Sequence, residues 1–83
     1  MFWRDNPELY HKMMEARVQR LWSDLFGPSI AQYTTNTFVK NRILYVSMSS
    51  SVVRNELLAM RKRLVAELNK HAGAEVIDDV MIR

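Results

Sequence analysis

The sequence predicts an α+β fold, a two-layer sandwich with helices on one face of a small three-stranded sheet. Apolar residues recur at helical spacing in two long segments, whereas β-favouring residues gather in two others. The predicted order is helix, short helix, two strands, helix and strand. The chain has 83 residues, which corresponds to a single domain covering residues 1–83.

The first helix is predicted to begin near Asn6 or Pro7, because asparagine is a good N-cap and proline is tolerated at the first helical position. Its apolar face, at spacings of three and four, consists of Tyr10, Met14, Val18, Leu21 and Leu25. Gly27-Pro28 should end this helix, and residues 30–33 should add a short helical turn. The apolar Met1-Phe2-Trp3 before the helix is interpreted as a hydrophobic staple or as part of a preceding helix.

A β-hairpin is predicted from Thr37 to Met48, with Asn41-Arg42 as a two-residue turn. In the corresponding register Val39 lies opposite Leu44, Thr37 opposite Val46, and Phe38 opposite Tyr45. The face expected to pack on the helices holds Val39, Leu44, Val46 and Met48. The other face holds Phe38, Lys40, Ile43 and Tyr45.

One long basic helix should follow, because Ser49-Ser50-Ser51 offers several N-caps and Gly73 is a natural stop. Its predicted buried stripe is Val53, Leu57, Met60, Leu64 and Leu68. The segment from Glu75 to Arg83 is predicted to be the last strand. Its buried face would hold Val76, Val80 and Ile82.

The positive charge of the chain is concentrated in one segment. Residues 40–63 carry six basic side chains against Glu56 alone, although the whole chain has a net charge of only +3. A localised basic patch indicates an anionic partner, so these six are the candidate nucleic-acid-binding residues: Lys40, Arg42, Arg54, Arg61, Lys62 and Arg63. A solvated helix face plus a turn is the alternative interpretation. Phe38 and Tyr45 could stack on unpaired bases or face a partner protein.

Catalytic and metal chemistry have little support in the sequence. The chain contains no cysteine and only two glycines, so thiol chemistry and a phosphate-binding loop are not expected. His11 and His71 lack nearby acidic or serine partners, and the adjacent Asp78 and Asp79 would point to opposite faces of a strand, as solvated edge charges. We therefore expect no enzymatic activity, catalytic residue, metal, cofactor or small-molecule substrate. The absence of a signal peptide and of a long apolar run favours a cytoplasmic protein without a membrane partner.

Several short motifs, in order and spacing, resemble one family. They are Trp22, Gly27-Pro28-x-Ile30-Ala31-x-Tyr33-Thr34, Val39-Lys40-Asn41, Leu44-Tyr45-Val46, Ser49-Ser50, Glu56-Leu57, Arg61, Leu64-Val65, Leu68-Asn69, Gly73, Val76-Ile77 and Arg83. This pattern resembles the DciA family of bacterial replicative-helicase loaders, especially the short members of Bacteroides-type bacteria. The resemblance implies a KH-like domain that binds the replicative helicase and single-stranded DNA, promoting helicase loading without hydrolysing ATP itself.

Two departures from the pattern limit what the resemblance implies. The sequence has no G-x-x-G loop, so nucleic acid cannot be held as in true KH domains. The flexible basic tail of longer family members is also missing from this sequence. Two further interpretations therefore remain open: a KH-like RNA-binding module, and a protein-interaction domain that binds no nucleic acid.

Overall fold

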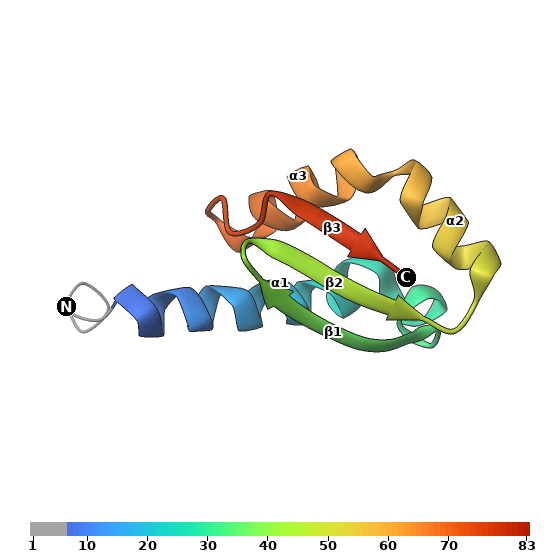
Figure 1. Ribbon diagram of the computed structural model, residues 1–83, viewed down its shortest axis with the longest axis horizontal. Helices are drawn as coiled ribbons and strands as arrows, with labels where there is room; N and C mark the ends of the chain where they lie inside the picture. The colour runs from blue at the N-terminus through green and yellow to red at the C-terminus, as the bar shows by residue number, and fades with distance from the viewer. Residues whose placement is uncertain (1–6) are drawn as a thin grey trace.

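Three helices pack on one face of a three-stranded sheet in the computed structural model, which describes residues 7–83 (Figure 1). The elements are α1 (Pro7–Ala31), β1 (Thr34–Lys40), β2 (Ile43–Met48), α2 (Ser51–Ala59), α3 (Arg61–Ala72) and β3 (Asp79–Ile82). The α+β class is confirmed, and the order of elements roughly matches the predicted one. The expectations for Met1-Phe2-Trp3 and Asn6 lie outside the described residues.

Helix α1 supplies the largest side chain of the core. Met14, Val18 and Trp22 are buried at spacings of four, whereas Tyr10, predicted on the buried face, is 37% exposed. The indole Nε1 of Trp22 donates a hydrogen bond to Thr34 Oγ1 at 3.1 Å, which ties α1 to the start of β1. Gly27 interrupts the helix at φ 68° and ψ −174°, as its position before Pro28 predicts, and one further helical turn follows.

The hairpin of β1 and β2 has the predicted register. Val39 pairs with Leu44, Phe38 with Tyr45 and Thr37 with Val46, and Asn41 and Arg42 both have positive φ, as a type I′ turn requires. Strand β3 runs parallel to β2 on its other side, so β2 is the central strand. The inward side chains of β2 and β3 are buried against the helices: Leu44, Val46, Val80 and Ile82.

The prediction of one long helix after the serines is wrong, because the helix is interrupted at Met60. Met60 has φ −107° and ψ 12°, ends α2, and begins α3 in a different direction (Figure 1). Its side chain, expected in the buried stripe, is 42% exposed. The break separates two short helices that each bury an apolar side against the sheet, Leu57 on α2 and Leu64 with Leu68 on α3. Ser50 is the N-cap of α2, because its Oγ accepts the Val53 amide hydrogen.

Strand β3 is shorter than predicted, since residues 73–78 form a loop. Gly73, at φ 84°, ends α3 as expected. Asn69 then holds the loop: its Oδ1 accepts from the Val76 and Ile77 amides at 2.9 and 3.1 Å, and its Nδ2 donates to Ile77 O at 2.8 Å. These bonds bury Ile77 in the core before β3 begins.

Candidate nucleic-acid interface

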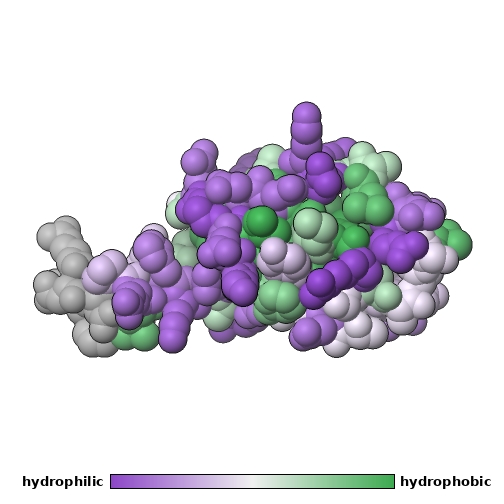
Figure 2. All heavy atoms as spheres, viewed as in Figure 1, coloured by the Kyte–Doolittle hydropathy of each residue, from purple (hydrophilic) through white to green (hydrophobic). Residues whose placement is uncertain are grey.

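The sheet has one face that the described helices do not cover. Successive residues of a strand point to opposite faces, and paired residues on neighbouring strands point to the same face. The register therefore shows which side chains of the three strands lie on this uncovered surface. We call it the open face, and its members are Phe38, Lys40, Ile43, Tyr45, Asp79, Met81 and Arg83. Met81 is 43% exposed there. Figure 2 shows apolar side chains gathered over the sheet, with strongly hydrophilic side chains around and across them.

An aromatic pair lies at the centre of the open face. The rings of Phe38 and Tyr45 stack with their centroids 4.8 Å apart and their planes within 10°. The guanidinium carbon of Arg83 lies 5.8 Å from the Phe38 centroid and 5.4 Å from that of Tyr45, within cation–π range of both. The prediction that both aromatics share the outward face is therefore correct. The contact of Arg83 with this pair was not predicted, although the alternation of residues 79, 81 and 83 along the strand could have indicated it.

Arg42 is bound to the segment that precedes β3. Its Nε and Nη2 donate to the two carboxylate oxygens of Asp78 at 3.0 Å each, and Nη2 also donates to Glu75 O at 2.9 Å. The hydrogen bond from Arg42 lowers the pKa of Asp78, and the hydrogen bond to Asp78 raises the pKa of Arg42. Asp78 is thus a bidentate partner of Arg42 and not merely the solvated edge charge that was predicted.

Arg61 has a similar partner at the other acidic position. Its Nε lies 3.3 Å from Asp79 Oδ1, in a pair whose side chains are 47% and 42% exposed. The same oxygen accepts the Val80 amide hydrogen at 2.8 Å. Like Asp78, Asp79 is therefore the partner of an arginine and not merely a solvated edge charge, and two of the six candidate cations, Arg42 and Arg61, are partly neutralised.

The other four candidates pair with no carboxylate among residues 7–83: Lys40, Arg54, Lys62 and Arg63. Lys62 and Arg63 join Arg61 in the first turn of α3, where all three line an open depression with Leu58, Ala59 and Met60. No side chain caps this end of α3, so the positive end of the helix dipole adds to their field. Lys40 and Arg42 lie apart from this group, at the hairpin tip. The break at Met60 also removes the helical seven-residue spacing that would have aligned Arg54 with Arg61.

The two histidines lie on different helices. His11 is exposed on α1, whereas His71 Nδ1 in the last turn of α3 lies 2.9 Å from Glu67 O and 3.8 Å from Glu67 Oε2. The expectation that His71 lacks an acidic partner is therefore wrong. No group of histidine, aspartate and glutamate side chains within residues 7–83 could hold a metal ion.

The sequence comparison assigns a family. A family model described as "Dna[CI] antecedent, DciA" matches residues 2–82. The chain belongs to the DciA family. DciA proteins are non-enzymatic accessory proteins of DNA replication that act in helicase loading. No curated protein and no solved structure matches the chain significantly. None of the helices in the described part of this DciA chain is long and apolar enough to span a membrane.

Proposed function

We propose that this DciA-family chain is a non-enzymatic domain of residues 1–83 that binds the replicative helicase and single-stranded DNA and promotes helicase loading. The family match over residues 2–82 supports the helicase as partner. The side chains of the open face support single-stranded DNA as the second partner. A cytoplasmic location is part of this proposal, because the loader must reach the helicase at the chromosome.

The observation that carries the DNA-binding proposal is the aromatic pair beside unpaired cations. A single strand exposes both its phosphates and the faces of its bases, whereas a duplex hides the faces. Phe38 and Tyr45 stack on each other, and a base that stacks on either ring would meet the guanidinium of Arg83 beside it. Arg83 and Lys40 supply positive charge on the same face. This combination favours single strands over duplex DNA.

The six basic side chains remain candidates for phosphate contacts, with a ranking that follows from their partners. Lys62 and Arg63 are exposed, adjacent in α3 and without an acidic partner in the described region, so they rank first. Lys40 and half-buried Arg54 are also unpaired there. Arg61 must leave Asp79 before it can bind a phosphate, and Arg42 is held by two acceptors at the hairpin tip. The phosphate path should therefore centre on the start of α3.

Fluorescence anisotropy with labelled single-stranded DNA, duplex DNA and RNA of one length, over a salt series, tests this proposal. We expect the tightest binding to single-stranded DNA and a steep loss of affinity with salt. The double variant Lys62→Glu/Arg63→Glu should bind much more weakly. The matched control, Lys12→Glu/Lys70→Glu, makes the same charge change at exposed lysines of α1 and α3 and should bind more tightly than the first variant.

The outcomes separate the alternatives. No binding to any of the three nucleic acids at low salt would refute the DNA part, and preference for RNA would support an RNA-binding module instead. Equal losses in the two double variants would show that net charge alone matters and that the start of α3 is not the site. Co-elution of the chain with its cognate replicative helicase in size-exclusion chromatography tests the partner.

A further inference from the structure

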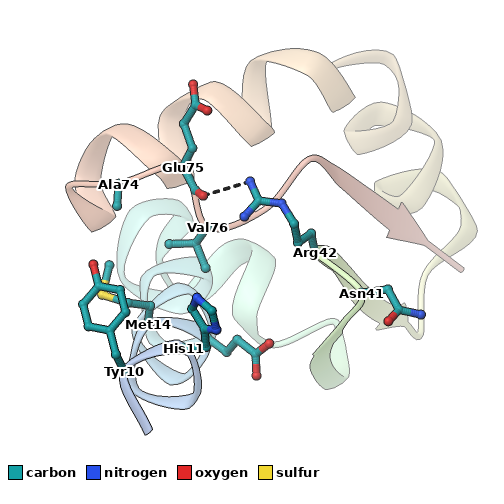
Figure 3. A pocket seen from close by; sticks show the side chains of 9 residues that line it. Tyr10, His11, Met14, Asn41, Arg42, Ala74, Glu75 and Val76 are labelled. Carbon is teal, nitrogen blue, oxygen red and sulfur yellow. Dashed lines mark hydrogen bonds between the residues drawn. The ribbon is translucent and has the colours of Figure 1, made fainter. Parts of the chain in front are cut away.

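A cavity of about 260 Å³ lies away from the open face, where three segments distant in sequence meet (Figure 3). Helix α1, the hairpin turn and the loop of residues 73–78 line it: Tyr10, His11, Met14, Glu15, Asn41, Arg42, Ala74, Glu75 and Val76. We call it the hairpin-end pocket. Of its lining residues only Arg42 is among the candidate phosphate contacts, and Arg42 is already held by Asp78 and Glu75.

The size and lining of the hairpin-end pocket suit one side chain of a partner protein. Pockets for small molecules usually enclose about 300–1,000 Å³, so this one is small for a metabolite. Met14 is buried at its base, Val76 and Ala74 are half-buried, and Tyr10 presents an exposed ring. Interface hot spots are commonly single large apolar or aromatic side chains seated in pockets of this kind.

The walls of the pocket are held in place by hydrogen bonds. Figure 3 shows Arg42 reaching across to the backbone oxygen of Glu75, a bond of 2.9 Å, while its other contacts go to Asp78. Asn69 fixes the backbone at Val76, and Arg17 Nη1 donates to Ala72 O at 3.1 Å beside the end of α3. A partner would therefore meet a largely preformed site, which lowers the entropy lost on binding.

The charge of the rim selects the kind of partner. The positive charge of Arg42 is offset by Asp78, whereas Glu15 and Glu75 form no ion pair within residues 7–83. The lining is thus acidic on balance, which disfavours a phosphate backbone and favours lysine or arginine near the inserted side chain. The uncapped start of α3, with its three basic residues, lies at a different end of the sheet from the hairpin turn (Figure 1).

We propose that the hairpin-end pocket is the helicase-docking site and that it receives one large apolar side chain flanked by lysine or arginine. This inference rests on the proposed function, because it takes the replicative helicase as the partner. It also separates the two partners on the molecule. The helicase occupies the acidic hairpin end while single-stranded DNA occupies the open face and the start of α3.

Biolayer interferometry on the immobilised cognate helicase tests the pocket with two kinds of variant. Ala74→Trp fills the cavity, and Glu15→Lys/Glu75→Lys reverses the rim charge. Each should raise the Kd for the helicase by roughly tenfold or more. The matched controls are Ala66→Trp on the exposed side of α3 and Asp24→Lys/Glu56→Lys at exposed carboxylates elsewhere, and both should keep the wild-type Kd.

Binding of single-stranded DNA provides the second readout. Ala74→Trp should leave DNA affinity unchanged, whereas Glu15→Lys/Glu75→Lys should tighten DNA binding through its added positive charge while it weakens helicase binding. Opposite changes in the two affinities cannot come from unfolding. The charge variant alters side chains on the rim only, so it remains informative if Ala74→Trp fails to fold.

Each other outcome overturns the inference in a recognisable way. If wild type binds the helicase and both pocket variants bind equally well, the docking site lies elsewhere and the proposed function survives. If wild type does not bind the helicase, the proposed partner fails and the pocket inference fails with it. A third outcome is that deletion of residues 1–6 strengthens helicase binding while Ala74→Trp has no effect in the full chain. The occupant of the pocket would then be the chain's own N-terminal segment and not a helicase side chain.

Discussion

Replacing Asp79 with asparagine should strengthen the binding of single-stranded DNA. Asp79 pairs with Arg61 on the border of the open face, so its carboxylate competes with DNA phosphate for the guanidinium. Asparagine retains the Oδ1 atom that accepts the Val80 amide hydrogen at 2.8 Å, and the local backbone should not change. The substitution therefore releases one cation and removes one anion with little effect on the fold.

The size of the effect follows from the exposure of the pair. Both side chains are more than two-fifths exposed, and ion pairs of this kind contribute about 0–1 kcal/mol. Release of Arg61 should thus raise the affinity by up to about fivefold. If Arg61 then contacts a phosphate, the slope of log K against log salt should become steeper by about 0.7. Between 50 and 200 mM salt, that contact would account for a roughly 2.6-fold additional loss of affinity.

Fluorescence anisotropy with a labelled single strand at several salt concentrations measures both quantities. The control is Asp24→Asn, which makes the same charge change at an exposed carboxylate of α1. An equal gain in the two variants would mean that only net charge matters. A loss of affinity or an unchanged slope in Asp79→Asn would refute the idea that Arg61 is a DNA ligand restrained by Asp79.

Three further predictions concern the aromatic pair, the Asp78 carboxylate and Asn69. Phe38→Ala or Tyr45→Ala should weaken single-strand binding by about 1–3 kcal/mol for each base that stacks on the lost ring, as measured by anisotropy. Because Arg42 lowers the pKa of Asp78 below its unfolded value, this pair stabilises the fold at higher pH. That stabilisation should disappear as pH falls below about 4 and through the lowered pKa, which a series of thermal midpoints against pH would show. Asn69→Leu should reduce the free energy of unfolding in urea by about 3 kcal/mol, because it removes three hydrogen bonds to the loop of residues 73–78.

Each of these predictions has a variant that isolates its cause. Thr35→Ala, at an exposed position of β1, should leave DNA affinity unchanged. In Asp78→Asn the thermal midpoint should fall less between neutral and acidic pH than in the wild type. If it falls equally, other carboxylates cause the loss of stability in acid. Asn69→Asp keeps the two acceptor bonds and should lose less stability than the leucine variant. Equal losses would show that the acceptor bonds are not what holds the loop.

The hairpin could be predicted in detail because its signals are local. Alternating side chains fix the two faces, and a two-residue turn fixes the register, so the positions of Phe38 and Tyr45 followed directly. The break at Met60 gave no such signal. Methionine favours helices, no glycine or proline is nearby, and the apolar spacing continues through Leu57, Met60 and Leu64. The packing of two helices against different parts of the sheet sets the break, which is a tertiary effect.

The candidate site was predicted less completely because its contacts join distant segments. Asp78 and Arg42 are 36 residues apart, and no sequence pattern connects them. The hairpin-end pocket likewise exists only after three segments have assembled. Charge clustering selected six basic residues as candidates, yet only the fold shows which of them already have acidic partners.

The conformation of Arg42 has a consequence for how the domain folds. At φ 64° it occupies the left-handed region, which costs a non-glycine residue roughly 1–2 kcal/mol, and the chain uses Asn-Arg where Asn-Gly would form the turn most readily. The hydrogen bonds to Asp78 and Glu75 can offset that cost only after the loop of residues 73–78 has packed beside the hairpin turn. We therefore expect the turn to be completed late in folding, by contacts of high sequence separation. An excised peptide of residues 34–48 should not form the hairpin by itself, and closure of this end of the sheet should slow folding of the whole chain.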